Sequence, residues 1–375
     1  MNQEDLVKNL ESKLEKVHTQ SLDLSFNELL DMYLDGELDI KPEYQRLFRW
    51  TEGARSRFIE SLLLEMPVPP IYVVEDENGS YELIDGLQRF SSYLHLRGQL
   101  DAPHLPNPIK LGDTLKLEDC DIVKELNGYS YEGLPLALKI RLKRAFVRVE
   151  VVRKGSDKKF RYHMFKRLNT GGTELTPQQL RNCVIRMLDS TFIDFIIECS
   201  KNSDFITCVS KISEDQKLGV YDQELVLRFF ALKNYRNKFV HDLSDFLTEY
   251  MEIVTEQETL NSLFNYEKEQ NIFSKTFKIL NLILGEKIFG RWGSIAPQSN
   301  FAVYQYESIV IAIQKVIDNI DENNEAHIDK VKQVILNIKK NKKFITQTTG
   351  GGKNSKGALA KRIEIAESFF EGLTL

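Results

Sequence analysis

Hydrophobic and polar positions alternate along several short stretches in the first half of the chain, and this spacing predicts β-strands. Residues 71–76, IYVVED, and residues 81–85, YELID, are β-branched and aromatic runs separated by ENGS, whose Asn-Gly pair favours a hairpin turn. Residues 144–155, RAFVRVEVVRKG, alternate in the same way, and residues 108–119, PIKLGDTLKLED, fit another strand pair. We therefore expect a small sheet in this part of the chain.

Segments with helical spacing of hydrophobic residues lie between these stretches. Residues 25–36, SFNELLDMYLDG, begin with a capping-box pattern at Ser25 and end at a glycine. Thr51 precedes a helical segment that ends at the prolines of MPVPP, because proline lacks a donor and fixes the backbone. Leucines at helical spacing near the N-terminus predict an amphipathic helix at residues 1–20, which docks on the body of the protein or on a second copy in a homo-oligomer.

From residue 171 onward nearly all hydrophobic residues follow the helical period. TPQQLRNCVIRML begins a helix with Thr176 as its cap and Pro177 in its first turn, and residues 156–169 predict a helix before it. The chain is thus expected to be α+β, with a small mixed sheet followed by helices. Its predicted parts are an N-terminal helix, an α+β domain and an all-helical domain, at residues 1–20, 21–170 and 171–375.

Composition is that of a globular protein. Hydrophobic residues make up 42% of the chain and charged residues 28%, which is too apolar for a disordered protein. The apolar runs are shorter than the roughly 18 residues needed to cross a bilayer, and the first residues do not resemble a signal peptide. We therefore expect a cytoplasmic protein without membrane contact. The cysteines and histidines show no zinc, metal-hydrolase or nucleophile spacing.

The net charge of −5 is spread unevenly along the sequence. Residues 136–167 hold 12 basic residues against two acidic ones, and residues 330–362 hold ten basic residues and no acidic one. Such asymmetry fits a polyanionic partner, either a nucleotide or a nucleic acid. The alternative is that these lysine-rich segments are solvated helix faces.

The stretch YELIDGLQRFSSYLHLRG, residues 81–98, begins like a strand and ends like a helix, with Asp85, Gly86, Gln88 and Arg89 at the joint. A glycine there lets the backbone turn sharply and leaves the first helical amides unpaired, which attracts anions. Arg89 can donate to a phosphate oxygen, Asp85 can hold hydrated Mg²⁺ or orient Arg89, and Gln88 can position a water. The structural alternative is that Asp85 caps the helix and pairs with Arg89.

A second pattern suited to anions lies at residues 167–182, RLNTGGTELTPQQLRN. Two adjacent glycines between Asn and Thr residues let successive amides point into one concavity, as in phosphate-binding nests. No GK[ST] follows the glycines, so the loop is not a Walker A motif. A plain helix-to-helix turn is the alternative. The candidate nucleotide-binding residues of this loop are Asn169, Thr170, Gly171, Gly172 and Thr173.

Two further segments suit nucleotides or nucleic acid. In residues 42–50, PEYQRLFRW, aromatic and guanidinium groups together fit base stacking and phosphate contact, or the aromatics pack an edge segment onto the hairpin. Residues 348–362, TTGGGKNSKGALAKR, form a glycine-rich basic loop that either clamps an anion or has no function. The residues assigned here are Gln45 and Arg46 for nucleotide, and Tyr44, Arg49, Lys353 and Lys356 for nucleic acid.

The order of YQR, MPVPPIYV, YELIDGLQRFSSY and FKRLNTGGTELTPQQLRN resembles the N-terminal domain of GmrSD-type restriction enzymes and of related defence nucleases of the SspE type, a branch of the ParB/sulfiredoxin-like superfamily. The resemblance implies that fold, with nucleotide binding and hydrolysis. The family's DGQQR hallmark reads DGLQR here, so Leu87 replaces a glutamine. That change weakens nucleotide contact if the glutamine touches nucleotide, and costs nothing if it points into the core. The superfamily's second phosphate-contacting segment maps onto residues 165–173, which places Asn169 near metal or phosphate.

Relatives commonly carry a C-terminal HNH nuclease, which needs a general-base histidine, whereas after residue 241 this sequence has only His327, in an ordinary helical context. We therefore expect a sensor or regulator of a bacterial restriction or anti-phage system that binds and hydrolyses NTP with Mg²⁺ and acts through a separate nuclease or other effector. Catalysis falls to Asp85, Gln88 and Arg89, and metal binding to Asp85 and Asn169. The alternative is a DNA-binding module without nucleotide turnover.

Overall fold

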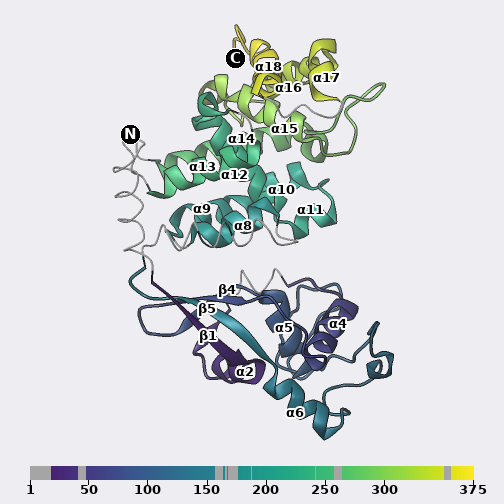
Figure 1. The fold of residues 1–375 in the computed structure, drawn as a ribbon. Coiled ribbons are helices and arrows are strands. Elements are labelled where there is room, and N and C mark those ends of the chain that lie inside the picture. Colours follow the sequence, from purple (N-terminus) through teal and green to yellow (C-terminus); the bar gives the residue numbers. More distant parts are fainter. Residues whose placement is uncertain are drawn as a thin grey trace. The chain divides into compact units, whose positions relative to one another are not determined.

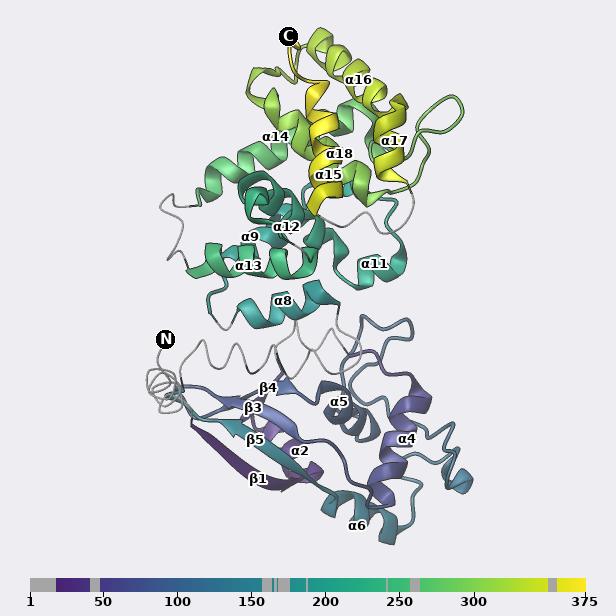
Figure 2. The ribbon, with the colours of Figure 1, turned by 45° about the horizontal axis from the view of Figure 1, so that its top comes forward.

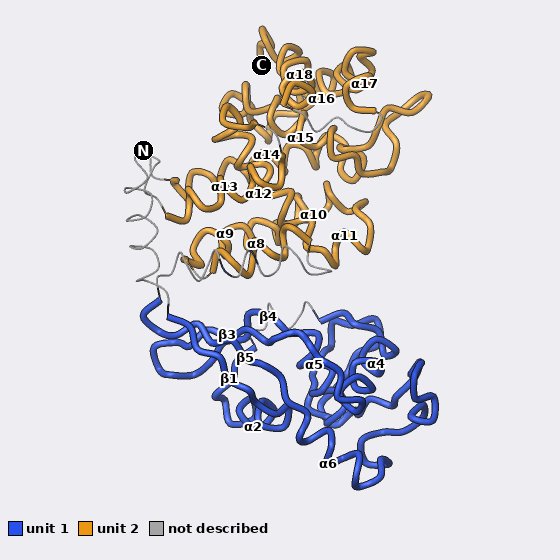
Figure 3. The backbone as a smooth tube through the Cα atoms, in the orientation of Figure 1, with its two compact units in different colours: residues 1–174 blue, residues 175–375 orange. Residues whose placement is uncertain are grey.

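The computed structural model describes residues 18–40, 48–156, 164, 167, 176–186, 188–240, 242–256, 264–349 and 356–375. The chain divides into two compact units, unit 1 with residues 1–174 and unit 2 with residues 175–375 (Figure 3). All strands of the described chain belong to unit 1, and unit 2 is made of helices (Figure 1). The predicted α+β class is confirmed.

Unit 1 is built on a five-stranded mixed sheet. Its strands lie in the order β1 (Thr19–Ser25), β5 (Phe146–Val152), β3 (Ile71–Glu75), β4 (Tyr81–Asp85) and β2 (Leu38–Asp39). β1 runs antiparallel to β5 and β3 antiparallel to β4, whereas β3 with β5 and β2 with β4 are parallel. The predicted hairpin is confirmed, because β3 and β4 pair through a turn closed by Asp76 and Ser80, with Gly79 at a φ of 90°.

Unit 1 also contains the described α-helices α2 (Phe26–Leu34), α4 (Glu52–Leu63), α5 (Leu87–Leu96) and α6 (Leu136–Arg144), and the short 3₁₀-helix Lys124–Leu126. Ser25 caps α2 and Thr51 caps α4, since each hydroxyl accepts a hydrogen bond from the amide three residues further on, as predicted. α4 and α5 lie side by side next to the sheet (Figures 1 and 2). Phe26 and Phe90 are fully buried in the core of this unit.

Two expectations for unit 1 are wrong in part. Residues 108–119 form no strand and make only isolated bridges, because the chain turns at Gly112, which has a φ of 95°, and leaves too few aligned residues for a ladder. Thr19 and Gln20, expected at the end of the N-terminal helix, lie instead in β1, which pairs residue by residue with β5. The rest of that helix, and most of the helix expected at residues 156–169, lie outside the described residues.

Unit 2 packs its helices around an aromatic core. Phe229, Phe230, Phe273 and Phe277 form successive ring contacts, with centroids between 4.5 and 6.0 Å apart. The helices are α8 (Pro177–Ile185), α9 (Thr191–Ser200), α10 (Ser203–Val209), α11 (Glu214–Leu218), α12 (Tyr221–Asn234), α13 (Leu243–Glu256), α14 (Tyr266–Leu284), α15 (Val303–Ala312), α16 (Glu325–Lys340), α17 (Lys342–Thr348) and α18 (Lys356–Ser368). α15 and α18 lie side by side (Figure 2). In the part of the chain that is described, no helix has the length and apolar character to span a bilayer.

Candidate functional site

The joint between β4 and α5 requires a glycine. Gly86 follows Asp85, the last residue of β4, and takes a φ of 104° and a ψ of 8°, a left-handed conformation that L side chains rarely adopt. A Cβ atom at this position would lie 2.8 Å from Cγ1 of Ile71 on the neighbouring strand β3. The predicted sharp turn is therefore confirmed, and it leads the chain directly into the first turn of α5.

No side chain caps the N-terminus of α5. The residue at the cap position is Gly86, which has no hydroxyl or carboxylate to offer, and Asp85 does not take over that role. Helix N-termini carry a partial positive charge on their unpaired amides, so an uncapped first turn suits an anion. Leu87, at the position of the family's glutamine, is buried with 4% of its surface exposed, so its side chain adds nothing to the surface of the joint.

Asp85 and Arg89 form an ion pair across the first turn of α5. Nη2 of Arg89 lies 3.2 Å from Oδ2 of Asp85 and donates a second hydrogen bond to the carbonyl oxygen of Pro70 at 2.8 Å. The Arg89 side chain is 16% exposed and that of Asp85 is 33% exposed. The alternative to a phosphate-binding role was that Asp85 caps α5 and pairs with Arg89. The pairing is present and the capping is absent. The pair and the bond to Pro70 fix the guanidinium beside the first turn of α5.

Gln88 ties α5 to the segment that precedes α4. Its Oε1 atom accepts hydrogen bonds from the backbone N–H groups of Arg49 at 3.0 Å and Trp50 at 3.1 Å. Trp50 in turn packs edge-on against Phe58 of α4, with ring centroids 5.9 Å apart. These bonds occupy the oxygen that a water-positioning role would use, and they hold the end of the PEYQRLFRW segment beside the joint.

Arg55 and His95 hold the same segment from its other side, and the sequence reasoning missed both. Nε of Arg55 donates to the carbonyl oxygen of Trp50 at 2.8 Å, and its Nη1 lies 3.0 Å from Nδ1 of His95. The guanidinium also lies over the ring of Phe48, 5.0 Å from its centroid. His95 comes seven residues after Gln88 and therefore shares its face of α5, which is the one signal in the sequence that links the two.

Burial sets the charge state of the Arg55–His95 pair. A guanidinium only donates, so Nδ1 of His95 accepts and the ring proton lies on Nε2. Burial, reinforced by the charge of Arg55, lowers the pKa of His95 from 6.5 to about 4. Burial also lowers the pKa of Arg55. At neutral pH the pair thus carries one charge, on Arg55, within the hydrogen-bonded network that includes Gln88.

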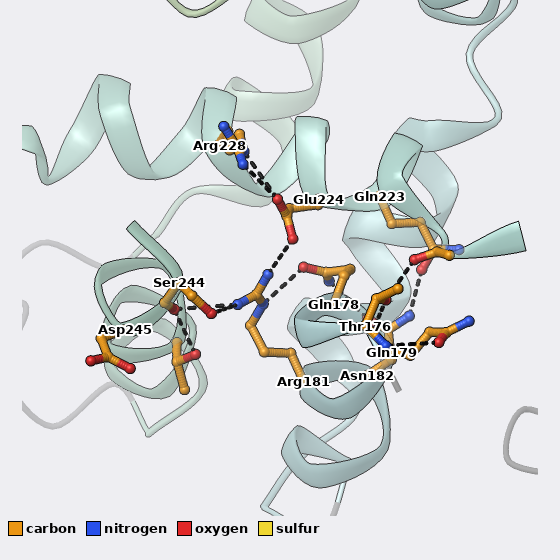
Figure 4. Close-up of polar contacts among 12 residues, drawn as sticks. Thr176, Gln178, Gln179, Arg181, Asn182, Gln223, Glu224, Arg228, Ser244 and Asp245 are labelled. Atoms are coloured by element: carbon orange, nitrogen blue, oxygen red, sulfur yellow. Dashed lines mark hydrogen bonds and ion pairs between the residues drawn. The ribbon is translucent and has the colours of Figure 1, made fainter. Parts of the chain in front are cut away.

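The motif TPQQLRN forms the start of α8 and anchors that helix within unit 2 (Figure 4). Thr176 and Gln179 form a reciprocal capping box with Pro177 in the first turn, so the predicted cap is confirmed. Oγ1 of Thr176 also donates to the carbonyl oxygen of Gly219 at 2.7 Å, and Nε2 of Gln179 donates to that of Leu218 at 2.8 Å. The start of α8, just after the diglycine loop, is therefore fixed against the end of α11.

Further along α8, Arg181 begins a buried charge chain, which we define as Arg181, Glu224, Arg228, Glu307 and Arg362. Arg181 and Arg228 each pair with Glu224 of α12 at 2.7 Å (Figure 4). Arg228 pairs with Glu307 of α15 at 2.5 Å, and Glu307 pairs with Arg362 of α18. Burial lowers the pKa of Arg181 to about 10. Removing one partner of a buried pair lowers the free energy of unfolding by about 3–5 kcal/mol. The buried charge chain therefore holds α8, α12, α15 and α18 together.

The other predicted site residues are only partly within the described chain. Arg49 is joined to Gln88 through its backbone, and Lys356 is the exposed first residue of α18. Outside the described residues lie Tyr44, Gln45, Arg46 and Lys353, together with the loop residues Asn169, Thr170, Gly171, Gly172 and Thr173. The convergence of the two glycine bends, and the metal role of Asn169, therefore stay predictions.

A single carboxylate at the joint suits a magnesium ion that arrives with a nucleotide. Among the described residues, no group of three or more His, Cys, Asp or Glu side chains is arranged to hold a metal. Magnesium in phosphate sites is bound through one or two carboxylates, while phosphates and waters fill the remaining positions. Asp85 meets this requirement, because a third of its side chain is exposed.

Many cations of the two basic stretches have structural partners. In the first stretch, ion pairs join Lys139 to Glu132, Arg141 to Glu65, Arg148 to Asp23 and Arg153 to Glu75. In the second stretch, Arg362 belongs to the buried charge chain, and Lys339 is buried with its Nζ donating to the carbonyl oxygen of Gly290 at 2.7 Å. The positive charge seen along the sequence is thus reduced in the folded units.

A comparison with known protein families gives a match to part of the chain. A family model for the GmrSD restriction endonuclease, N-terminal domain, matches residues 26–186. The match begins at the first residue of α2, covers the joint and includes α8, although that helix lies in unit 2. No curated protein matches the chain. The family suggests a component of a restriction or anti-phage system.

Proposed function

We propose that this chain, whose residues 26–186 match the model of the GmrSD-type N-terminal domain, is an NTP-hydrolysing sensor or regulator of a restriction or anti-phage system. The observation that carries the proposal is the joint itself. A required glycine, an uncapped helix N-terminus and a partly exposed Asp85–Arg89 pair meet at the end of one strand. Each of these features favours a phosphate group.

In this proposal Arg89 supplies the positive charge at the phosphates. Its Nη2 atom is fixed by Asp85 and by Pro70, so little side-chain entropy is lost on binding. Within the described chain no hydrogen bond uses Nη1, which leaves that atom for a phosphate oxygen. The first amides of α5 donate to the same group, and Asp85 holds the magnesium ion that accompanies the nucleotide.

The same arrangement supports the proposal of hydrolysis. As the terminal phosphoryl group leaves, negative charge builds up on its oxygens, and a fixed guanidinium stabilises that charge without reorganisation. We assign residues 169–173 to the same phosphates. The support for this is the sequence NTGGT, whose adjacent glycines suit a phosphate-binding nest.

Phosphate release from the four NTPs with Mg²⁺ tests the proposal. Arg89→Ala and Asp85→Asn should each lower the rate about a hundredfold or more, because each removes charge stabilisation or metal binding. The matched control is Arg148→Ala, which breaks an equivalent but exposed Arg–Asp pair between β5 and β1. Equal rates in the wild type and both joint variants would overturn the proposal. Stabilisation by NTP that Arg89→Ala abolishes, without phosphate release, would reduce it to nucleotide binding.

The alternative of a DNA-binding module without turnover is tested on the same preparations. Binding through several phosphates weakens steeply as salt rises. The ion pairs within the basic stretches leave fewer cations for such contacts. Absence of DNA binding at low salt would eliminate this alternative.

A further inference from the structure

Unit 1 carries an open groove of about 790 Å³ between the end of α4, the helix α6 and the start of β5. Apolar side chains form much of its lining: Met66, Pro67, Val68, Ala137, Ile140 and Phe146. The joint at residues 85–89 contributes nothing to this lining, so the groove is separate from the proposed nucleotide site. We call it the α6 groove.

The α6 groove and its rim expose large apolar side chains. Phe146 is 69% exposed, and Leu136, one helical turn before Ile140, is 72% exposed. Of the residues of α6 only Leu142 is buried, so the helix presents most of its apolar side chains outward. Scattered exposed hydrophobic residues are common, but exposed apolar residues gathered along one groove mark a binding surface.

In the lining of the groove every acidic side chain has an ion-pair partner among the described residues, but not every basic one does. Its two acidic lining residues are each bound to an arginine of the same lining, Asp23 to Arg148 at 3.0 Å and Glu65 to Arg141 at 3.5 Å. Arg144 also lines the groove and takes part in no ion pair with any described residue. The charge left for a partner is therefore positive.

We infer that the α6 groove binds a segment of a partner protein that presents apolar side chains with carboxylates beside them. The apolar lining fits anchors such as Leu or Phe, which amphipathic helices place in hydrophobic grooves. Arg144 and its neighbour Lys143, both exposed, fit the flanking carboxylates and favour the approach of an acidic segment. The inference does not depend on nucleotide hydrolysis at the joint.

A protein segment fits this groove better than the other anionic partners do. Single-stranded nucleic acid needs several aromatic platforms, and the lining holds one aromatic residue, Phe146. The phosphate backbone of a duplex offers no apolar group for the apolar side chains of the lining. A lipid surface is bound by apolar side chains that protrude from a convex face, whereas these line a concavity.

Fluorescence anisotropy with a labelled synthetic peptide tests the inference on the full chain. The probe carries leucines at helical spacing with glutamates between them, and its partner probe has the same composition with the leucines dispersed. Phe146→Ser and Arg144→Glu should each weaken binding of the first probe about tenfold or more. Both side chains are exposed, so neither change should unfold the unit. Ile295→Ser, at an 89% exposed residue of unit 2, is the control and should change nothing.

Binding of the spaced probe that depends on both Phe146 and Arg144 supports the inference. Equal affinity for the two probes would overturn it, because charge alone would then account for the binding. Absence of binding up to about 1 mM would also overturn it. The inference would also be overturned if a random DNA duplex or vesicles of phosphatidylserine bind the protein and this binding depends on Phe146 and Arg144.

Discussion

Acidification is expected to destabilise unit 1 through His95. The folded unit keeps this ring neutral, since Nδ1 accepts from the guanidinium of Arg55 at 3.0 Å. A protonated ring has no acceptor to offer and would place a second cation against the first. Residues 48–50 are held by Arg55 and by Gln88. Protonation of His95 should weaken the support from Arg55.

The size of the effect follows from the pKa of His95. Its ordinary value in the unfolded chain is 6.5, and in the folded unit it is about 4. Between these pH values the unfolded chain binds the proton more readily, so this contribution to stability is fully present above pH 6.5 and is lost as the pH falls towards 4. At about 1.4 kcal/mol for each pH unit, the complete loss is about 3 kcal/mol.

The two tryptophans allow the measurement to be made on unit 1 alone, because Trp50 lies in unit 1 and Trp292 in unit 2. In a Trp292→Phe background, the fluorescence of Trp50 during urea denaturation gives the free energy of unfolding at pH 7 and pH 4.5. His95→Gln is the matched variant, because its amide oxygen can accept from Arg55 but does not titrate. Between the two pH values, the protein with His95 should lose about 2–3 kcal/mol more than the variant. An equal loss in both proteins would refute the reasoning.

Three further predictions concern single positions. Gly86→Ala should destabilise unit 1 by about 1–3 kcal/mol in urea denaturation and abolish NTP binding, whereas Gly79→Ala, which has a similar φ of 90° but no neighbour within 4 Å, should cost less. For Lys339, burial lowers the pKa to about 7, so between pH 7 and 10.5 the unfolded chain binds more protons than the folded one. As the pH rises through this range, the free energy of unfolding of the wild type should therefore increase by a few kcal/mol relative to that of Lys339→Met. A difference between their melting curves that stays constant with pH would contradict this. Glu65 has a φ of 57° just after α4, so Glu65→Gly should raise the unfolding free energy by up to about 1 kcal/mol, since the exposed pair with Arg141 at 3.5 Å contributes little; a decrease would show that the ion pair matters more than the strain.

The features of unit 1 that depend on residues close together in the sequence were predicted correctly. The hairpin follows from an Asn-Gly turn between two β-branched runs, and the helix starts at Ser25, Thr51 and Thr176 follow from hydroxyl caps. The edge strands were missed for an equally physical reason. β1 has a polar sequence and is a strand because it pairs along its whole length with β5, while β2 spans only two residues.

The same division holds for the candidate site. The turn at Gly86 was predictable, because a glycine between a strand and a helix favours a sharp change of backbone direction. The roles of Arg55 and His95 were not, since the imidazole that contacts the buried guanidinium lies 40 positions away in the sequence. The ion pairs within the basic stretches could not be predicted either, because partners such as Arg148 and Asp23 lie far apart in the chain.

The buried charge chain limits how this sequence can change over time. Its five members alternate in sign across α8, α12, α15 and α18, so a neutral substitution at Glu224 or Glu307 leaves arginines facing each other in the interior. Descendants of this protein should therefore keep all five residues or replace several at once with an apolar set of similar volume. A change at one position alone would cost about 3–5 kcal/mol, a large part of the roughly 5–15 kcal/mol by which folded proteins are usually stable.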